Sequence, residues 1–262
     1  MKKIQLLLTI VFSTIVLMSW KAFDNSWIVE QHKGYNLIYT SPDRDNIKEY
    51  NKLVENGINS VKAFFNSSYN KGFDIFIHPD RHSLDSAWQK DWNMPDFRSE
   101  CWMVASGVAF KLDIISPKVW AKEACEHSYA ETKKTQQLIT HELVHVYHGQ
   151  LNASDDFTNV EGIDWFVEGL ATYASGQCDS FRISEIKKAV SENKIPNRLD
   201  SFWTGKFKYA LSGSVVMYID SKYGRSKLKK LLPFNKKSQI LSALNTTEAE
   251  LLSEWKNYIQ KL

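Results

Sequence analysis

The sequence predicts an α+β fold, with a mixed sheet and helices in an N-terminal lobe and only helices in a C-terminal lobe. Two segments rich in aromatic and β-branched residues, 34–41 and 73–78, predict strands. Between them, residues 44–66 carry apolar side chains at helical intervals. The second half of the chain continues with helical patterns to its end.

The chain's 262 residues are enough for one domain with a sizeable core. We expect this domain over residues 27–262, with the α+β lobe at about 27–149 and the helical lobe at about 150–262. The formal net charge is +3, of which Lys2 and Lys3 supply two units. The remainder is nearly neutral, so the composition predicts no general attraction to nucleic acid.

The first 22 residues predict a signal peptide or a retained N-terminal membrane anchor. Lys2 and Lys3 precede an almost wholly apolar run from Ile4 to Trp20, which is the pattern of an export signal. The run is also close to the shortest length that spans a bilayer. We therefore expect a protein exported to the periplasm or the exterior, or anchored facing outward, and leave cleavage open.

The chain has three cysteines, so a disulfide bond of the kind expected in an exported protein would leave one cysteine unpaired. Cys101 could pair with Cys125 in an oxidising compartment and leave Cys178 free, but other pairings are equally allowed. No two cysteines have the spacing of a cysteine metal site.

Residues 101–117 predict a hairpin or bent strand whose two apolar runs are separated by Ser106-Gly107. A strand at this place could bind an extended peptide by adding it to the sheet, or it could be an ordinary buried strand. Before it comes a group of aromatic residues that we expect in the core or at a cleft rim, with carbohydrate stacking as a lesser alternative: Trp88, Trp92 and Phe97.

The most informative pattern is His141-Glu142-Leu143-Val144-His145. It lies in a segment free of proline and glycine that predicts a helix, with Thr135 as a reasonable N-cap and Gly149 at the end. Residues four apart on a helix lie on one face, with Cβ atoms roughly 5–6 Å apart. Both histidines can therefore bind one zinc ion at about 2.0–2.1 Å, and Glu142, beside the metal, can act as general base on a zinc-activated water. The alternative is a pair of surface or core histidines without a metal.

His148 shares this face but lies roughly 10 Å along the axis from His141. One ion cannot bridge that distance, so we exclude His148 from the metal site. We expect it to interact with the last carbonyl groups of its own helix.

A catalytic zinc ion usually has three protein ligands, and Glu168 is the best candidate for the third. Asp164 can cap a helix that is apolar nearly all round, where a carboxylate is costly unless it is paired. A zinc ion is a sufficient partner, and a salt bridge to Lys or Arg is the alternative. The small residues Gly169 and Ala171 should let this helix approach the histidine helix closely. The competing acids lie in a polar segment that predicts a surface loop: Asp155, Asp156 and Glu161.

Together the two segments resemble the gluzincins, zinc metallopeptidases whose third ligand is a glutamate, and more narrowly the small secreted peptidase-MA-like domains. The likeness rests on the His-Glu-x-x-His helix and on Trp165-Phe166-Val167-Glu168-Gly169-Leu170-Ala171, and it extends to the helical pattern at 208–218. It implies a gluzincin-like architecture, with one Zn²⁺ held by His141, His145 and Glu168, and with Glu142 as the base.

The resemblance also implies a tyrosine or histidine that stabilises the oxyanion of the reaction. We choose Tyr209, which could instead be a core residue; the other candidates are Tyr173, Tyr218 and Tyr223. Two departures stand out. The stretch between His145 and Glu168 is longer than in the best-known gluzincins. Some relatives carry an aspartate where this chain has Thr172, so Asp164, Thr172 and backbone carbonyls all stay open as partners of the ligand histidines.

The expected function is that of an exported zinc metallopeptidase acting on a peptide or protein. No Gly-x-Met-Glu-Asn stretch of the kind that binds a free amino terminus is present, which favours an endopeptidase over an aminopeptidase. The alternative is a catalytically idle relative that binds zinc and serves as a binding or sensor protein.

Overall fold

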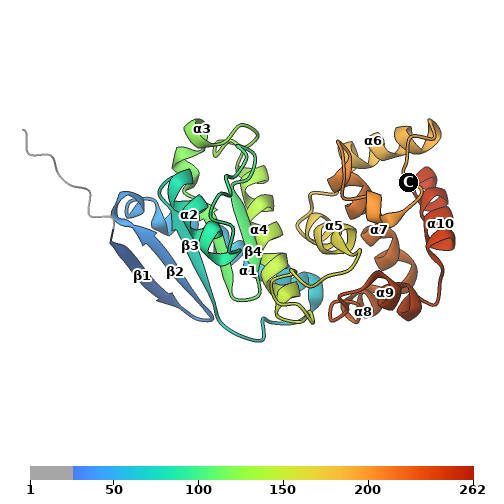
Figure 1. Ribbon diagram of the computed structural model, residues 1–262, viewed down its shortest axis with the longest axis horizontal. Coiled ribbons are helices and arrows are strands. Elements are labelled where there is room, and N and C mark those ends of the chain that lie inside the picture. The colour runs from blue at the N-terminus through green and yellow to red at the C-terminus, as the bar shows by residue number, and fades with distance from the viewer. Residues whose placement is uncertain (1–25) are drawn as a thin grey trace, which may run out of the picture.

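A computed structural model describes residues 26–262 and confirms the α+β class (Figure 1). The predicted signal or anchor at residues 1–22 lies outside the described residues. One five-stranded mixed sheet occupies the N-terminal part, with the strands in the spatial order β1-β2-β3-β5-β4. Their bounds are β1 Trp27–His32, β2 Tyr35–Thr40, β3 Phe73–His78, β4 Ala105–Val108 and β5 Lys111–Ile115.

The central pairs β2–β3 and β3–β5 are parallel, whereas the outer pairs β1–β2 and β4–β5 are antiparallel. This arrangement follows from the connections, because long helical crossovers join the parallel strands and short turns join the antiparallel ones. It leaves β4 as an edge strand of the sheet. This strand also contacts the helix that carries His141 and His145.

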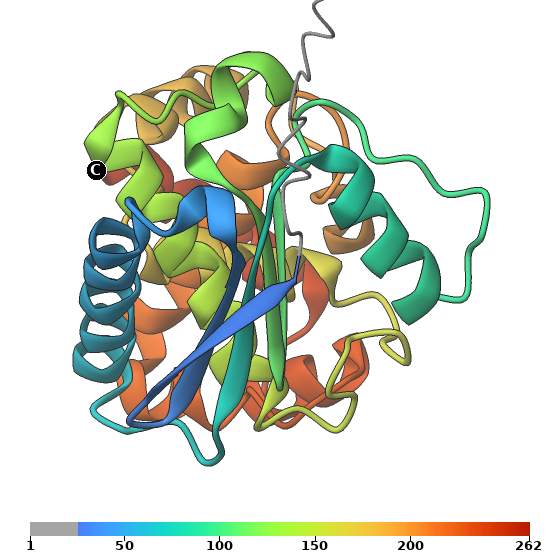
Figure 2. The same cartoon turned by 90° about the vertical axis from the view of Figure 1, so that its left-hand side faces the viewer.

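The helices described beside the sheet are α1 (Ile47–Phe65), α2 (Arg81–Asp91), α3 (Trp120–Glu123) and α4 (Thr132–Gly149). Figure 2 shows α1 and α2 flanking the strands. Helix α1 packs directly on α4, and Gly57 makes this possible: a Cβ there would lie 2.6 Å from the Leu143 side chain. The buried back of α4, including Leu143 and Tyr147, thereby joins the main core.

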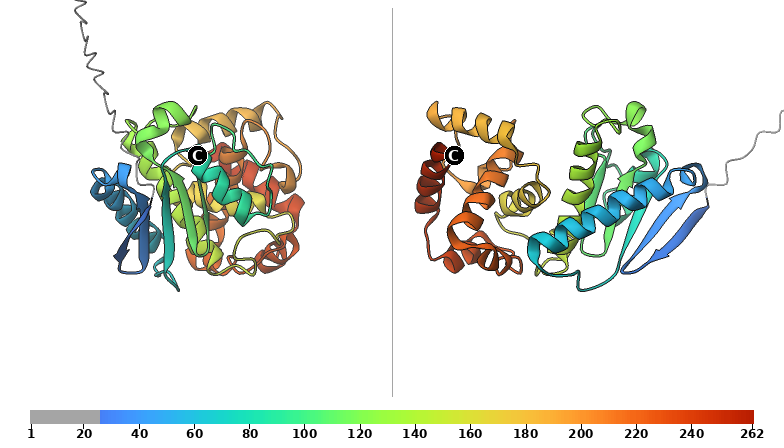
Figure 3. Two further views of the ribbon diagram at one scale, coloured as in Figure 1. Left: turned by 60° about the vertical axis from the view of Figure 1, so that its left-hand side comes forward. Right: turned by 180° about the vertical axis from the view of Figure 1, so that it is seen from behind.

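Helices form the C-terminal part, which Figure 3 shows from two further sides: α5 (Asp164–Ala174), α6 (Ser180–Ser191), α7 (Lys208–Tyr223), α8 (Arg225–Lys229), α9 (Lys237–Leu244) and α10 (Glu248–Lys261). Gly169 of α5 does allow a close helix contact, but with α7. A Cβ at Gly169 would lie 2.4 Å from the carbonyl oxygen of Ser212. Helices α4 and α5 do contact each other, but the close approach that Gly169 permits is to α7.

Several local expectations also need correction. Strand β1 and helix α2 were not predicted, and Ser106-Gly107 lies within β4, with the turn at Ala109-Phe110. Helix α4 begins at Thr132 rather than near Thr135, and Asp164 is the first residue of α5 rather than its cap.

The aromatic group predicted for the core or a cleft rim forms one packed cluster. The ring of Trp92 lies 4.9 Å from that of Trp88 and 5.0 Å from that of Phe97, and Trp88 is buried. Trp88 belongs to the main core, and Phe97 packs against it.

A disulfide bond joins Cys101 to Cys125, and Cys178 is free. It links the segment before β4 to the segment before α4. The guanidinium group of Arg81 reinforces the same link by donating hydrogen bonds to the carbonyl groups of Met103 and Glu123, among others.

Among residues 26–262, no helix has the length and apolar character needed to cross a bilayer.

Candidate metal centre

Helices α4 and α5 bring together three side chains of types that can bind a metal ion. His141 and His145 lie one turn apart on α4, and Glu168 lies on the second turn of α5. The three donor atoms all lie within 4.8 Å of one another. The structure therefore brings together the three residues that the sequence suggested as ligands, and they form a candidate metal site.

The distances between these donors match the size of a zinc ion. The two Nε2 atoms are 3.1 Å apart, and the Glu168 Oε2 atom lies 3.4 Å from that of His141 and 3.6 Å from that of His145. Two ligands bound tetrahedrally to zinc at 2.0–2.1 Å are separated by about 3.3 Å. Two imidazoles and a carboxylate are also a donor set that zinc uses at catalytic sites. The residues present thus fit one zinc ion.

Glu168 is in the protonation state that a metal requires. Burial alone would raise the pKa of this carboxyl group, but the imidazoles of His145 and His141 outweigh burial and bring the pKa well below its usual value. Within residues 26–262, Glu168 makes no ion pair with a lysine or arginine. The alternative of a buried salt bridge to such a residue is not observed.

Glu142 is not one of the three donors, but it lies close enough to interact electrostatically with His141 and Glu168. Burial raises the pKa of its carboxyl group to about 7, an effect opposed by His141 and by a hydrogen bond from the main-chain N–H of Gly107. Gly107 belongs to β4 and touches α4 closely. A Cβ at this position would lie 2.3 Å from the carbonyl oxygen of Glu142 and 3.2 Å from the Cβ of His145. A carboxyl group with a pKa near neutrality can both accept and release a proton.

Tyr209 lies at the start of α7, where its ring meets the His141 ring edge to face at 6.2 Å. Burial, together with the charges of Glu168 and Glu142, raises the pKa of Tyr209, so the phenol keeps its proton at neutral pH. The neighbouring Lys208 ammonium group lies 4.4 Å from the Trp102 ring and 4.8 Å from the Trp203 ring. These contacts connect the start of α7 to the segment held by the disulfide bond.

The other candidate tyrosines lie elsewhere. The hydroxyl group of Tyr218 donates to Glu254 and that of Tyr173 donates to Asp220. Tyr223 ends α7, about 20 Å along the helix axis from Tyr209. Of the four candidate tyrosines, Tyr209 is the one whose ring contacts a residue of the candidate metal site.

His148 is outside the donor cluster, as expected, but its predicted partner was wrong. Its Nε2 atom donates to the carbonyl oxygen of Leu232, 3.1 Å away and remote in sequence, instead of to the last carbonyls of α4. The ring is fully buried, and this burial lowers the pKa of His148 to about 3. A neutral His148 thus serves packing between the two parts of the protein.

One polar contact to a candidate ligand was not predicted from the sequence. The Nδ1 atom of His141 lies 2.9 Å from Oε1 of Gln177, a residue not considered above. Thr172, which was considered, has a buried hydroxyl group with no hydrogen-bond partner among residues 26–262. The signal that could have found Gln177 is Gly176, because a glycine at a helix end commonly reverses the chain.

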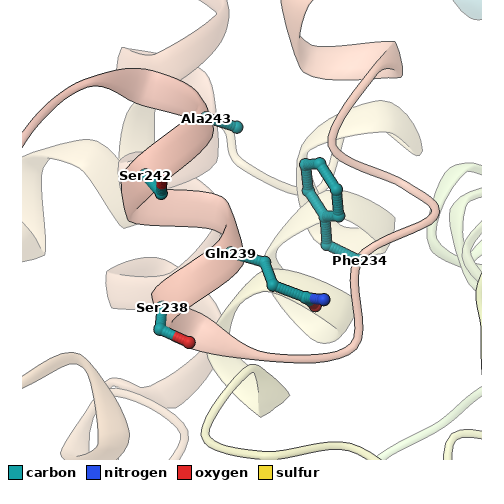
Figure 4. A pocket seen from close by; sticks show the side chains of 5 residues that line it. All are labelled: Phe234, Ser238, Gln239, Ser242 and Ala243. Atoms are coloured by element: carbon teal, nitrogen blue, oxygen red, sulfur yellow. The ribbon is translucent and has the colours of Figure 1, made fainter.

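Two surface hollows, each of about 390 Å³, contain none of the predicted site residues. The one shown in Figure 4 lies beside α9, and its lining carries no titratable group: Phe234, Ser238, Gln239, Ser242 and Ala243. The lining of the other hollow includes His32, Tyr35 and Asp74.

Comparison with known proteins adds only a distant likeness. No family model matches the sequence, and no curated protein matches it. Among solved structures, native yeast LTA4 hydrolase matches with 13% sequence identity and a TM-score of 0.49. The match covers 90% of this chain but 38% of that one, so this chain spans well under half the length of the yeast protein. A likeness of this size carries no assignment of function.

Proposed function

We propose that this protein is a zinc-dependent metallopeptidase of gluzincin-like architecture. The observation that carries the proposal is the convergence of His141, His145 and Glu168 at zinc-sized separations, with the Glu142 carboxyl group alongside. A purely structural zinc site is closed by four protein ligands and has no use for a base. Three ligands and a neighbouring carboxyl group instead suit hydrolysis.

The chain's own residues account for the proton transfers. When bound, zinc supplies Lewis-acid chemistry by polarising a carbonyl group and acidifying water. Glu142 accepts the proton of the attacking water and returns it to the departing amine, and so acts first as general base and then as general acid. The protonated phenol of Tyr209 donates a hydrogen bond to the oxyanion that develops on the substrate carbonyl.

The substrate we propose is a peptide or protein bound in extended form. Strand β4 is an edge strand, and its Gly107 N–H points to the Glu142 carboxyl group. A peptide that adds to the sheet along β4 would pass the catalytic groups, because an extended peptide can bind as an additional strand at a sheet edge. We favour internal cleavage over removal of amino-terminal residues, on the sequence argument given above.

We further propose that the protein is exported. The apolar N-terminal run has the pattern of an export signal. The Cys101–Cys125 disulfide bond supports this proposal, because such bonds persist in oxidising compartments and are rare in the cytosol.

Cleavage profiling tests the proposal against the idle-relative alternative. Zinc-loaded protein and its Glu142→Gln variant are incubated with a peptide library, and new termini are identified by mass spectrometry. We expect cleavage by the native chain alone, with equal zinc content in both proteins. Equal cleavage by the variant would exclude Glu142 as the base, and zinc binding without cleavage by the native chain would favour a binding or sensor role.

A further inference from the structure

The segment between α5 and α6 returns to the metal centre through the way α5 ends. The N–H of Gly176 donates to the carbonyl of Tyr173 at 3.1 Å, and the N–H of Gln177 donates to that of Thr172 at 3.0 Å. This pair of bonds is a Schellman motif, which requires a left-handed residue, and Gly176 supplies it with φ of +76°. The helix that carries Glu168 therefore ends in a turn that directs Gln177 back towards α4.

Two more contacts fix this turn. Gln137, one helical turn before His141, donates through Nε2 to the carbonyl oxygen of Gly176 at 2.6 Å. The guanidinium group of Arg182 donates to the carbonyl oxygen of Gln177. The main chain of Gln177 is thus held on both sides, and its side chain is presented in a defined direction.

The Gln177 amide determines which nitrogen of His141 is free for a metal. Its Oε1 atom accepts from Nδ1 of His141 at 2.9 Å, so Nδ1 carries the proton and Nε2 keeps its lone pair towards His145 and Glu168. The second ligand has no such support: Nδ1 of His145 is buried without a hydrogen-bond partner in the described part of the chain. Within the described part of the chain, Gln177 is therefore the residue whose hydrogen bond to Nδ1 orients a histidine of this pair.

We infer that Gln177 is the positioning residue of this metal centre and that it acts through a neutral amide. This inference rests on the metal site of the proposed function. The partner of a metal-binding histidine is commonly a carboxylate, a backbone carbonyl or water, and its loss costs about 10–100-fold in metal affinity. An amide orients the ring as a carbonyl does but adds no negative charge. A carboxylate at the same place should make the imidazole a stronger ligand.

Zinc titration of the full chain tests this inference. The dissociation constant for Zn²⁺ is measured by competition with a chromophoric chelator for the native protein, Gln177→Leu and Gln177→Glu. Gln136→Ala is the control. Gln136 lies on α4, as His141 does, but its side-chain amide donates to the carbonyl of Leu53, away from the metal centre. We expect Gln177→Leu to bind zinc about 10–100-fold more weakly, Gln177→Glu to bind at least as tightly as the native chain, and the control to be unchanged.

A second readout does not depend on the variants folding. In the metal-free native protein, ¹⁵N NMR of the histidine rings should show His141 protonated at Nδ1. A ring protonated at Nε2, or zinc affinity of folded Gln177→Leu within twofold of the native value, would overturn the inference. A native chain that takes up no zinc at all would instead refute the metal centre, and the inference with it.

Discussion

Gly107→Ala should abolish most of the proposed peptidase activity while the protein still folds. Gly107 lies in β4 where the strand touches α4, and a Cβ there would come within 2.3 Å of the Glu142 carbonyl oxygen and 3.0 Å of its carbonyl carbon. Ordinary contact begins near 3.4 Å, so the strand and the helix must separate by about 1 Å, a misplacement that can cost about 100-fold in rate. The hydrogen bond from Gly107 to the Glu142 carboxyl group lies at the same contact.

The expected stability loss follows from the same overlap. Overpacking of a well-packed contact costs about 1–3 kcal/mol, which corresponds to a fall in Tm of roughly 2–12 °C for a domain of this size. Gly72→Ala is the matched control, because its Cβ would meet its nearest neighbour, the Gly34 carbonyl oxygen, at an ordinary 3.5 Å. Calorimetry and kcat/KM on a peptide from the cleavage profile provide the assay. Native activity and an unchanged Tm in Gly107→Ala would refute the contact between β4 and α4.

Three further predictions concern single side chains. Glu168→Ala should weaken zinc binding by more than the roughly 10–100-fold that loss of an orienting partner costs. Glu161 is an exposed residue paired with Lys236, so Glu161→Ala should leave zinc binding unchanged. Equal effects of the two substitutions in chelator competition would exclude Glu168 as a ligand. Tyr209→Phe should lower kcat by about 100-fold or more with little change in KM, and full activity would remove its role as oxyanion donor. Because burial holds the pKa of His148 at about 3, only the unfolded chain binds a proton there as the pH falls below about 6.5. The free energy of unfolding should therefore fall with decreasing pH, and this residue should account for about 1.4 kcal/mol of the fall at pH 5.5. Urea unfolding at pH 7.5 and at pH 5.5 measures the fall, which should be smaller by that amount in His148→Gln.

The donor residues were predictable because their signals are local. Helical spacing alone places His141 and His145 on one face, and Glu168 stands out as a carboxylate in an apolar helix. The sequence does not show that α4 and α5 lie side by side. The structure shows this, because the three donor atoms on the two helices lie within 4.8 Å of one another.

Other features depend on contacts that the sequence does not display. Gly107 was placed in a turn because glycine usually marks one, but here glycine is required where α4 approaches the strand. Gln177 escaped notice because its role depends on a chain reversal that brings it to a helix 36 residues earlier in the sequence. The pairing of Cys101 with Cys125 was one possibility among equals, since sequence alone does not fix disulfide connectivity.

Anomalous diffraction at the zinc absorption edge, from crystals of the zinc-loaded full chain, tests the central claim most directly. We predict one strong peak between α4 and α5, about 2.0–2.1 Å from Nε2 of His141, Nε2 of His145 and a carboxylate oxygen of Glu168. Zinc held by other residues, or no peak in well-ordered crystals grown with excess zinc, would contradict the metallopeptidase assignment.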